Sequence, residues 1–251
     1  PRINASGRLG FSKLGVELFT SDSLEEAKSL ALMMDSKNTE RQEVEARIHM
    51  EVEDILSKDT SYRDDKVLVI SGKDWHHGII GIVASKVTEK YYKPCILLCQ
   101  DGDMAVGSAR SIKGFDIFSA LYECRDYMTK FGGHQQAAGM SMEVAKIALL
   151  REKINKIANY ELNQEDLVEV IKVEYEIDQA SLDLDLVDNL HILEPFGIKN
   201  PTPYFMMRNC LLKRLMPIGR DKNHLKLLVE KDKDFDVIGF NMAYLGTGYQ
   251  E

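Results

Sequence analysis

The sequence predicts an α/β domain followed by a small β-barrel, with a long helix in front of both. Strand-like and helix-like hydrophobic patterns alternate between residues 66 and 160, which is typical of an α/β layer. Short segments of alternating hydrophobicity, separated by turn residues, follow residue 163 and indicate a small barrel. The chain has 251 residues, 44% hydrophobic and 29% charged, which is enough for one large or two ordinary domains with a buried core.

The first element is a helix that begins with a capping box. Ser23 and Glu26 have the spacing at which two side chains cap the start of a helix. Apolar residues then recur every three or four positions to about Lys58, with a weak break at residues 35–38. The pattern fits one long bent helix or two short ones. A charged helix with so narrow an apolar stripe often bridges two domains. Packing of the stripe against a single core would explain the same pattern equally well.

The α/β region contains four expected strands and three expected helices. We expect strands at residues 66–72, 94–98, 104–110 and 138–142, and helices at residues 75–92, 116–130 and 143–160. In the first of these helices, Gly78 and Gly81 leave room for close contact with a strand. The helix over 116–130 is expected to end in a loop that contains Gly132, Gly133 and His134.

The last third of the chain has a different pattern. Strand alternation is expected between residues 168 and 177, and leucines on one face predict a helix from Ser181 to Leu193. The barrel strands are expected at residues 204–207, 211–216, 224–229 and 235–240.

Two segments have the composition of a site for an anionic group such as a phosphate. Gly132 and Gly133 let the backbone approach a ligand closely, and His134 is able to donate a hydrogen bond to a phosphate oxygen. Ser108 and Arg110 are two residues apart, so on a strand their side chains lie on one face. An arginine in an apolar domain needs an anionic partner. The alternatives are a tight turn with a surface histidine, and an internal salt bridge from Arg110 to Asp101, Asp103 or Asp116.

The remaining patterns argue against a metal site at the paired histidines, against disulfides and against a membrane segment. His76 and His77 are adjacent, and neighbouring side chains on a helix point about 100° apart, so they rarely bind one metal ion. The four cysteines stand in apolar surroundings, which favours reduced, buried thiols. With no apolar run of about 18 residues and no signal peptide, we expect a cytoplasmic protein without a membrane partner. Because the chain opens inside a motif, we expect it to be part of a longer protein.

The charge distribution separates one region from the rest. A net charge of −8 argues against a general polyanion binder. Between residues 199 and 226, however, seven basic residues accompany a single acidic one, Asp221. Such a patch either follows a nucleic-acid backbone or is a solvated strand face. Arg2, Asn4 and Arg8 near the N-terminus likewise form either a phosphate-contacting edge or a charged loop.

Five motifs stand out when the chain is taken in order: PRINASGRLG at residue 1, WHHGIIGIVAS at 75, GSARS at 107, FGGH with AAG at 131–139, and EPFG with NP at 194–201. As a set, they resemble the RecJ family of the DHH phosphoesterase superfamily, over essentially the whole chain. The resemblance implies a metal-dependent exonuclease that hydrolyses single-stranded DNA from 5′ to 3′ in recombination and repair.

The resemblance also implies an organisation. Residues 1–20 would be the tail of a catalytic DHH domain, 21–58 a connecting helix, 65–160 a DHH-associated domain with a mixed sheet and helices, and 165–251 an OB-fold, either complete or cut short. The family binds manganese or magnesium through aspartates and histidines of the DHH domain, which would precede residue 1. No Asp-His-His triplet occurs here. We therefore expect no metal ligand in this chain and no activity from it alone.

Residue roles follow from the matched motifs. Ser108 and Arg110 would hold the 5′-terminal phosphate, while Gly132, Gly133 and His134 would close over the scissile phosphate, with His134 as the catalytic residue. Contacts to DNA are expected at Arg2, Asn4 and Arg8 and, from charge rather than motif identity, at Lys213, Arg214, Arg220, Lys222 and Lys226.

The partner implied is single-stranded DNA, with a single-strand-binding protein and a helicase as further candidates. Two other functions compete with this one. The first is a DHH-type phosphodiesterase acting on short or cyclic nucleotides, although such relatives tend to end after the Gly-Gly-His domain. The second is a non-catalytic single-strand-binding module that uses the barrel alone.

Overall fold

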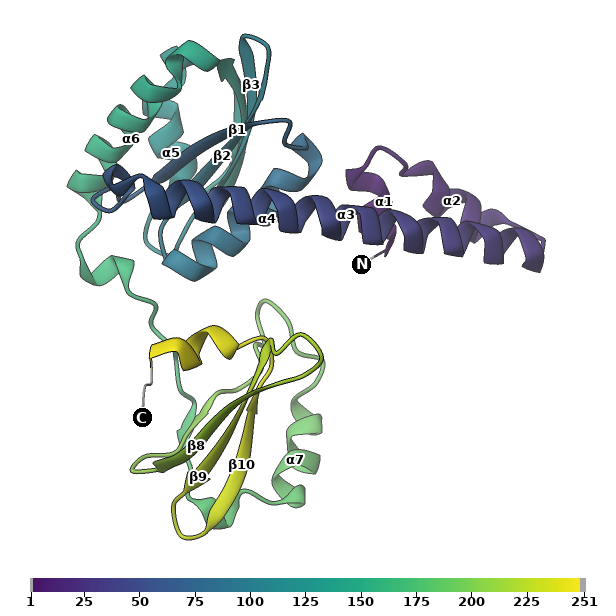
Figure 1. The fold of residues 1–251 in the computed structure, drawn as a ribbon, viewed down its shortest axis with the longest axis vertical. Coiled ribbons are helices and arrows are strands. Elements are labelled where there is room, and N and C mark those ends of the chain that lie inside the picture. The colour runs from purple at the N-terminus through teal and green to yellow at the C-terminus, as the bar shows by residue number, and fades with distance from the viewer. Residues whose placement is uncertain (1, 249–251) are drawn as a thin grey trace. The chain divides into compact units, whose positions relative to one another are not determined.

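The computed structural model describes residues 2–248, so Pro1 and residues 249–251 of the predicted first and last segments lie outside the described residues. The chain divides into two compact units, one up to residue 169 and one from residue 170. Figure 1 shows a mixed α/β body with a long helix in the first unit and a β-rich second unit. The predicted fold class is confirmed. Among the described helices, none combines the length and the apolar character needed to cross a membrane.

Three helices open the first unit. Helices α1 (Arg2–Arg8) and α2 (Lys13–Thr20) lie beside the N-terminal half of α3 (Leu24–Lys58), as Figure 1 shows. Helix α3 is a single helix of 35 residues, about 52 Å long at 1.5 Å per residue. Leu30 and Met34 are buried in its N-terminal half, and Ile48 and Val52 in its C-terminal half. The second pair belongs to the core under α4, so one helix joins two packed regions.

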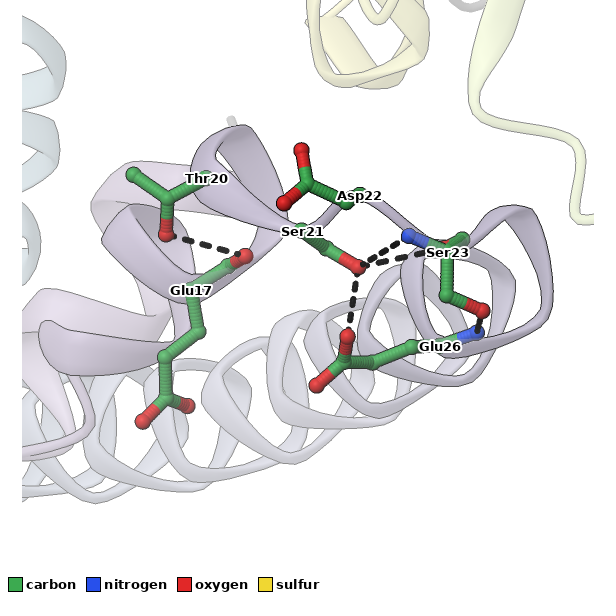
Figure 2. A pocket seen from close by; sticks show the side chains of 6 residues that line it. All are labelled: Glu17, Thr20, Ser21, Asp22, Ser23 and Glu26. Atoms are coloured by element: carbon green, nitrogen blue, oxygen red, sulfur yellow. Dashed lines mark hydrogen bonds between the residues drawn. The ribbon is translucent and has the colours of Figure 1, made fainter.

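The start of α3 shows how its cap is built. The Ser23 hydroxyl accepts a hydrogen bond from the Glu26 backbone N–H at 3.4 Å, as the capping box predicts. The Glu26 carboxylate does not return to the Ser23 backbone. It accepts from the Ser21 hydroxyl at 2.6 Å, and that hydroxyl oxygen accepts from the Ser23 N–H at 3.2 Å (Figure 2). The Ser21 hydroxyl therefore bridges the Glu26 carboxylate and the Ser23 backbone N–H, which contact each other directly in an ordinary capping box.

A five-stranded sheet forms the centre of the first unit. Its order is β1-β2-β3-β5-β4, with bounds β1 Leu68–Lys73, β2 Cys95–Asp101, β3 Met104–Arg110, β4 Met128–His134 and β5 Ala137–Glu143. Strands β1 and β2 are parallel and are joined by helix α4 (His77–Tyr91), whereas the other neighbours are antiparallel. The sheet is therefore mixed.

Helices cover the two faces of this sheet unequally. Helix α4 packs on β2 and β3 and is itself backed by α3, which buries Ile79, Ile80 and Val83. Helices α5 (Ile117–Glu123) and α6 (Ile147–Glu161) cover the opposite face. Figure 1 shows α5 and α6 on the side of the sheet away from α3 and α4. On the α4 face, β4 and β5 remain without a covering helix.

The helix predicted over residues 116–130 is wrong in its second half. Asp116 caps α5, accepting from two backbone N–H groups, but the helix ends at Glu123. After a short 3-10 turn, Met128–His134 form β4 and pair with β5. Cys124 and Met128 continue the apolar spacing of the helix, which is why the local pattern misleads. Pairing with a strand that follows in the sequence decides the outcome.

The second unit consists mainly of short strands and one short α-helix. Strands β8 (Leu211–Ile218), β9 (His224–Glu230) and β10 (Asp234–Gly239) form an antiparallel sheet in the order β10-β9-β8. Strands β6 (Tyr175–Glu176) and β7 (Phe205–Met206) form a two-residue parallel pair. Helix α7 (Leu184–Leu190) is shorter than predicted and continues as a 3-10 turn, His191–Leu193. The strand alternation predicted between residues 168 and 177 yields only β6.

Short 3-10 turns connect several of these elements. Besides His191–Leu193, they are Thr60–Tyr62, Arg125–Tyr127, Val144–Lys146, Glu165–Leu167, Gln179–Ser181 and Ala243–Gly248.

Candidate functional site

The sheet register brings the two predicted phosphate-binding segments to one face. Arg110 of β3 is paired with Ala137 of β5, which is paired with His134 of β4. Residues directly opposite each other on neighbouring strands point to the same face. Arg110 and His134 therefore share the α4 face, two strand spacings or about 10 Å apart at their Cα atoms. In the next row of that face, Ser108 is followed by glycines on β5 and β4.

Arg110 is half-buried and has no carboxylate partner among the described residues. Its guanidinium donates to the Ser108 hydroxyl at 2.9 Å and to the Ala109 carbonyl at 2.7 Å. The three aspartates considered as partners do not pair with it; Asp116, for example, caps α5. Burial lowers the pKa of Arg110, and the positive charge of Arg8 lowers it further. Two guanidiniums thus lie near each other without a negative charge between them, which is the electrostatics of an anion site.

Two glycines of α4 allow this arrangement. A Cβ at Gly81 would lie 2.8 Å from Nη2 of Arg110 and 3.0 Å from Oγ of Ser108. A Cβ at Gly78 would lie 2.2 Å from the carbonyl oxygen of Arg8, whose guanidinium donates to the Gly78 carbonyl at 3.3 Å. The expected strand contact is confirmed at Gly81. At Gly78 it is wrong, because the close neighbour is the end of α1.

The hairpin between β4 and β5 orients His134. Its Nδ1 accepts a hydrogen bond from the Gln136 backbone N–H at 3.3 Å, so the proton of the neutral ring lies on Nε2. The residue is exposed. Gly133 has φ +156°, and a Cβ there would lie 2.3 Å from the Ala137 carbonyl oxygen. A Cβ at Gly132 would meet no atom within 4 Å. The predicted loop is therefore a strand whose outer surface is open.

The remaining N-terminal candidates have other contacts. Arg2 forms an exposed ion pair with Asp35 at 2.6 Å, while Asn4 is exposed on α1. His76 caps α4 by accepting from the Gly78 N–H at 3.1 Å, and it stacks on His77. Between residues 2 and 248, no three His, Cys, Asp or Glu side chains are grouped so that they could hold a metal ion. All four cysteines are free; Cys95 and Cys124 are buried, and the other two are half-buried.

The basic patch of the second unit is partly neutralised by residues outside its sequence window. Lys213 contacts the carboxylates of Glu230 at 2.6 Å and Asp234 at 2.7 Å. Lys226 contacts Asp236 at 2.8 Å. These carboxylates come after residue 226 in the sequence and lie on β9 and β10 of the same sheet. The other three candidates form no ion pair among the described residues; they are Arg214, Arg220 and Lys222.

Comparisons with known proteins agree with this architecture. A model of the DHHA1 domain matches residues 64–159, and a model of the RecJ OB domain matches residues 173–251. Single-stranded-DNA-specific exonuclease RecJ from Bacillus subtilis is 35% identical over 99% of this chain, and that from Haemophilus influenzae 32% identical over 96%. The crystal structure of Thermus thermophilus RecJ in complex with Mn²⁺ superposes with a TM-score of 0.80 at 26% identity, over 96% of this chain. A second structure of that protein contains Mg²⁺.

A DHHA1 domain and an OB domain in this order define the chain as part of a DHH-superfamily protein. Within that superfamily it is of the RecJ type, since its OB domain and its similarity over nearly the whole chain both match RecJ. The chain spans 32% of the length of the Bacillus relative, 44% of the Haemophilus relative and 34% of the solved Thermus chain.

Proposed function

We propose that this chain is the DNA-gripping part of a metal-dependent exonuclease that degrades single-stranded DNA from its 5′ end in recombination and repair. The observation that carries the proposal is the row from Arg110 to His134 across β3, β5 and β4. It sets a half-buried guanidinium without a carboxylate partner among the described residues and an exposed imidazole on one open face. A row of this length accommodates two successive phosphates of an extended strand.

In this proposal Ser108 and Arg110 bind the 5′-terminal phosphate. The guanidinium offers several N–H donors in a plane, which suits a phosphate, and the Ser108 hydroxyl lies 2.9 Å from it. The charge of Arg8 adds to the attraction. Holding the terminal phosphate fixes the position of the next phosphodiester, so the grip supplies the 5′-to-3′ polarity.

His134 contacts that next phosphodiester. Because its Nδ1 is occupied by the Gln136 N–H, Nε2–H is free to donate to a phosphate oxygen. A fixed donor at this point stabilises negative charge that develops during hydrolysis. Gly132 leaves the approach open, and Gly133 holds the hairpin that aims the ring. The described residues do not supply a metal centre, so the ions found in the relatives would be held by other parts of the whole protein.

The OB domain extends the contact along the strand. Arg214 lies on β8, and Arg220 and Lys222 lie in the turn between β8 and β9. Because they are free of carboxylate partners in the described part of the chain, we propose them, ahead of Lys213 and Lys226, as contacts to downstream phosphates. Residues 1–20 as the tail of the catalytic domain, and a single-strand-binding protein and a helicase as partners, are proposed on family resemblance.

The grip is tested by Arg110→Ala in the complete enzyme with manganese. Initial rates on 5′-phosphorylated and 5′-hydroxyl single strands should fall unequally, because a charge-assisted contact contributes about 1.5–3 kcal/mol, roughly 10- to 150-fold. The phosphorylated strand should lose most. Arg125→Ala is the matched control, since Arg125 lies against Tyr122, away from the row. Equal losses on the two substrates would reject the grip.

A further inference from the structure

The uncovered part of the sheet continues beyond the phosphate row. Two residues along the strands from Ser108, the register pairs Val106 of β3 with Ser141 of β5, and Ser141 with Lys130 of β4. These residues share the face of Ser108, because side chains two apart on a strand point the same way. Together with Gly139 they line a shallow depression of about 260 Å³. We call this depression the shelf.

The shelf is open because α4 packs on β2 and β3 and does not extend over β5 and β4. Val106 is 44% exposed, although β3 has a paired strand on either side. A Cβ at Gly139 would have no neighbour closer than 3.9 Å, so the floor between the strands carries no side chain. Lys130 is exposed and forms no ion pair among residues 2–248. The surface thus combines an apolar patch, a flat floor and hydrogen-bond donors.

We propose that the shelf binds the base of the 5′-terminal nucleotide whose phosphate Ser108 and Arg110 hold. The proposal rests on the function proposed above. Two residues along a strand span about 6.6 Å, so the shelf begins one nucleoside's reach from the phosphate row. Its volume lies just below the usual range for whole small-molecule sites, which fits one nucleoside rather than a longer piece of strand.

The chemistry of the shelf suits any base. The Val106 methyl groups pack against the face of a base, which every base has. Lys130 only donates hydrogen bonds, whereas the Ser141 hydroxyl both donates and accepts. Both groups line the depression and turn on flexible or rotatable bonds, so they adapt to different base edges. We therefore expect the shelf to distinguish a nucleotide from a bare sugar phosphate without selecting one base.

The proposal is tested on the 251-residue chain itself by NMR titration with three probes. These are thymidine 5′-monophosphate, deoxyribose 5-phosphate and thymidine. Thymidine monophosphate should shift the amide signals of both the Ser108 row and the Val106 row. Deoxyribose 5-phosphate should shift the Ser108 row alone and bind about fivefold more weakly, since it buries no base against Val106. Thymidine alone should bind more weakly still.

Variants separate the shelf from the phosphate grip. Ser141→Phe fills the shelf with a residue that strands accept, and it should reduce thymidine monophosphate affinity to that of deoxyribose 5-phosphate. Met104→Ala is the control and should change neither affinity; Met104 lies on β3 and on the same face as Val106, but one row further out. Equal affinities of the two phosphates for the wild-type chain, or shifts confined to the Ser108 row, would overturn the shelf. Failure of both phosphates to bind would overturn the grip as well.

Discussion

Adjacent glycines in β4 should respond in opposite ways to the same substitution. Gly133→Ala places a methyl group 2.3 Å from the Ala137 carbonyl oxygen and 2.6 Å from the Ala138 Cα, both of which are backbone atoms of the paired strand. The φ of +156° adds strain for any L-residue with a side chain. Gly132→Ala places a methyl group in open space. The two variants therefore differ in the clash with the paired strand and in the backbone strain at residue 133.

The expected changes in the free energy of unfolding follow from these contacts. Backbone strain contributes about 1–3 kcal/mol and the clash with fixed atoms adds to it, so we expect Gly133→Ala to lower the free energy of unfolding by about 2–4 kcal/mol. Gly132→Ala should be neutral or stabilise by up to about 1 kcal/mol, because alanine reduces the entropy of the unfolded chain. For a unit of this size the first change lowers Tm by roughly 5–15 °C.

The measurement is urea unfolding of the 251-residue chain followed by tryptophan fluorescence. Trp75 is the single tryptophan and is buried in the core that α3, α4, β1 and β2 share, so its emission reports the first unit without interference from the second. The midpoint should fall for Gly133→Ala and hold for Gly132→Ala at an unchanged m-value. If the Gly133 variant is as stable as the wild type, the β4–β5 pairing described above is wrong.

Four further results are expected. Gly81→Ala should weaken inorganic phosphate binding severalfold by NMR titration, because the new methyl group lies 2.8 Å from the phosphate-binding guanidinium; unchanged binding would exclude the close packing of α4 on that side chain. Glu45→Ala should cost about 3 kcal/mol in urea unfolding, since the buried carboxylate pairs with two cations; a loss below about 1 kcal/mol would contradict this. Burial lowers the pKa of His49 below 6.5, so the unfolded chain takes up a proton more readily. Its contribution to stability should be complete above pH 6.5 and lost as the pH falls through the folded-state pKa, a slope that His49→Gln should flatten in urea titrations at several pH values. Arg220→Ala should reduce the slope of log affinity against log salt for single-stranded DNA by about 0.7, whereas Lys213→Ala, already paired with carboxylates, should change it less.

The sequence predicts those parts of the fold that are decided by neighbours in the chain. Strands β1, β2 and β3 are continuous apolar or alternating runs, so their periodicity alone identifies them. The same holds for α4. The placement of Ser108 and Arg110 on one strand face follows from their spacing, and the structure has both side chains hydrogen-bonded to each other.

The rest depends on contacts between distant residues. Nothing near Met128 shows that it begins a strand, because the partner strand β5 comes later in the chain. The ion pairs of Lys213 with Glu230 and Asp234 likewise join β8 to the other two strands of its sheet, which come later in the chain. The approach of Arg8 to Arg110 is decided by α4, whose glycines admit both.

The anion site is built from residues that are far apart in the sequence, and this has a consequence for the stability of the fold. Arg8 comes from the first helix and Arg110 from the third strand, and they meet only when α1, α4 and β3 are packed together. A bound phosphate therefore links the amino-terminal helices to the sheet. The denatured chain has no such binding site, so phosphate binds only the folded state. Occupancy at 100 times Kd should raise the resistance of the first unit to denaturant by about 2.7 kcal/mol. DNA binding thus stabilises the same packing of α1, α4 and β3 that forms the phosphate site.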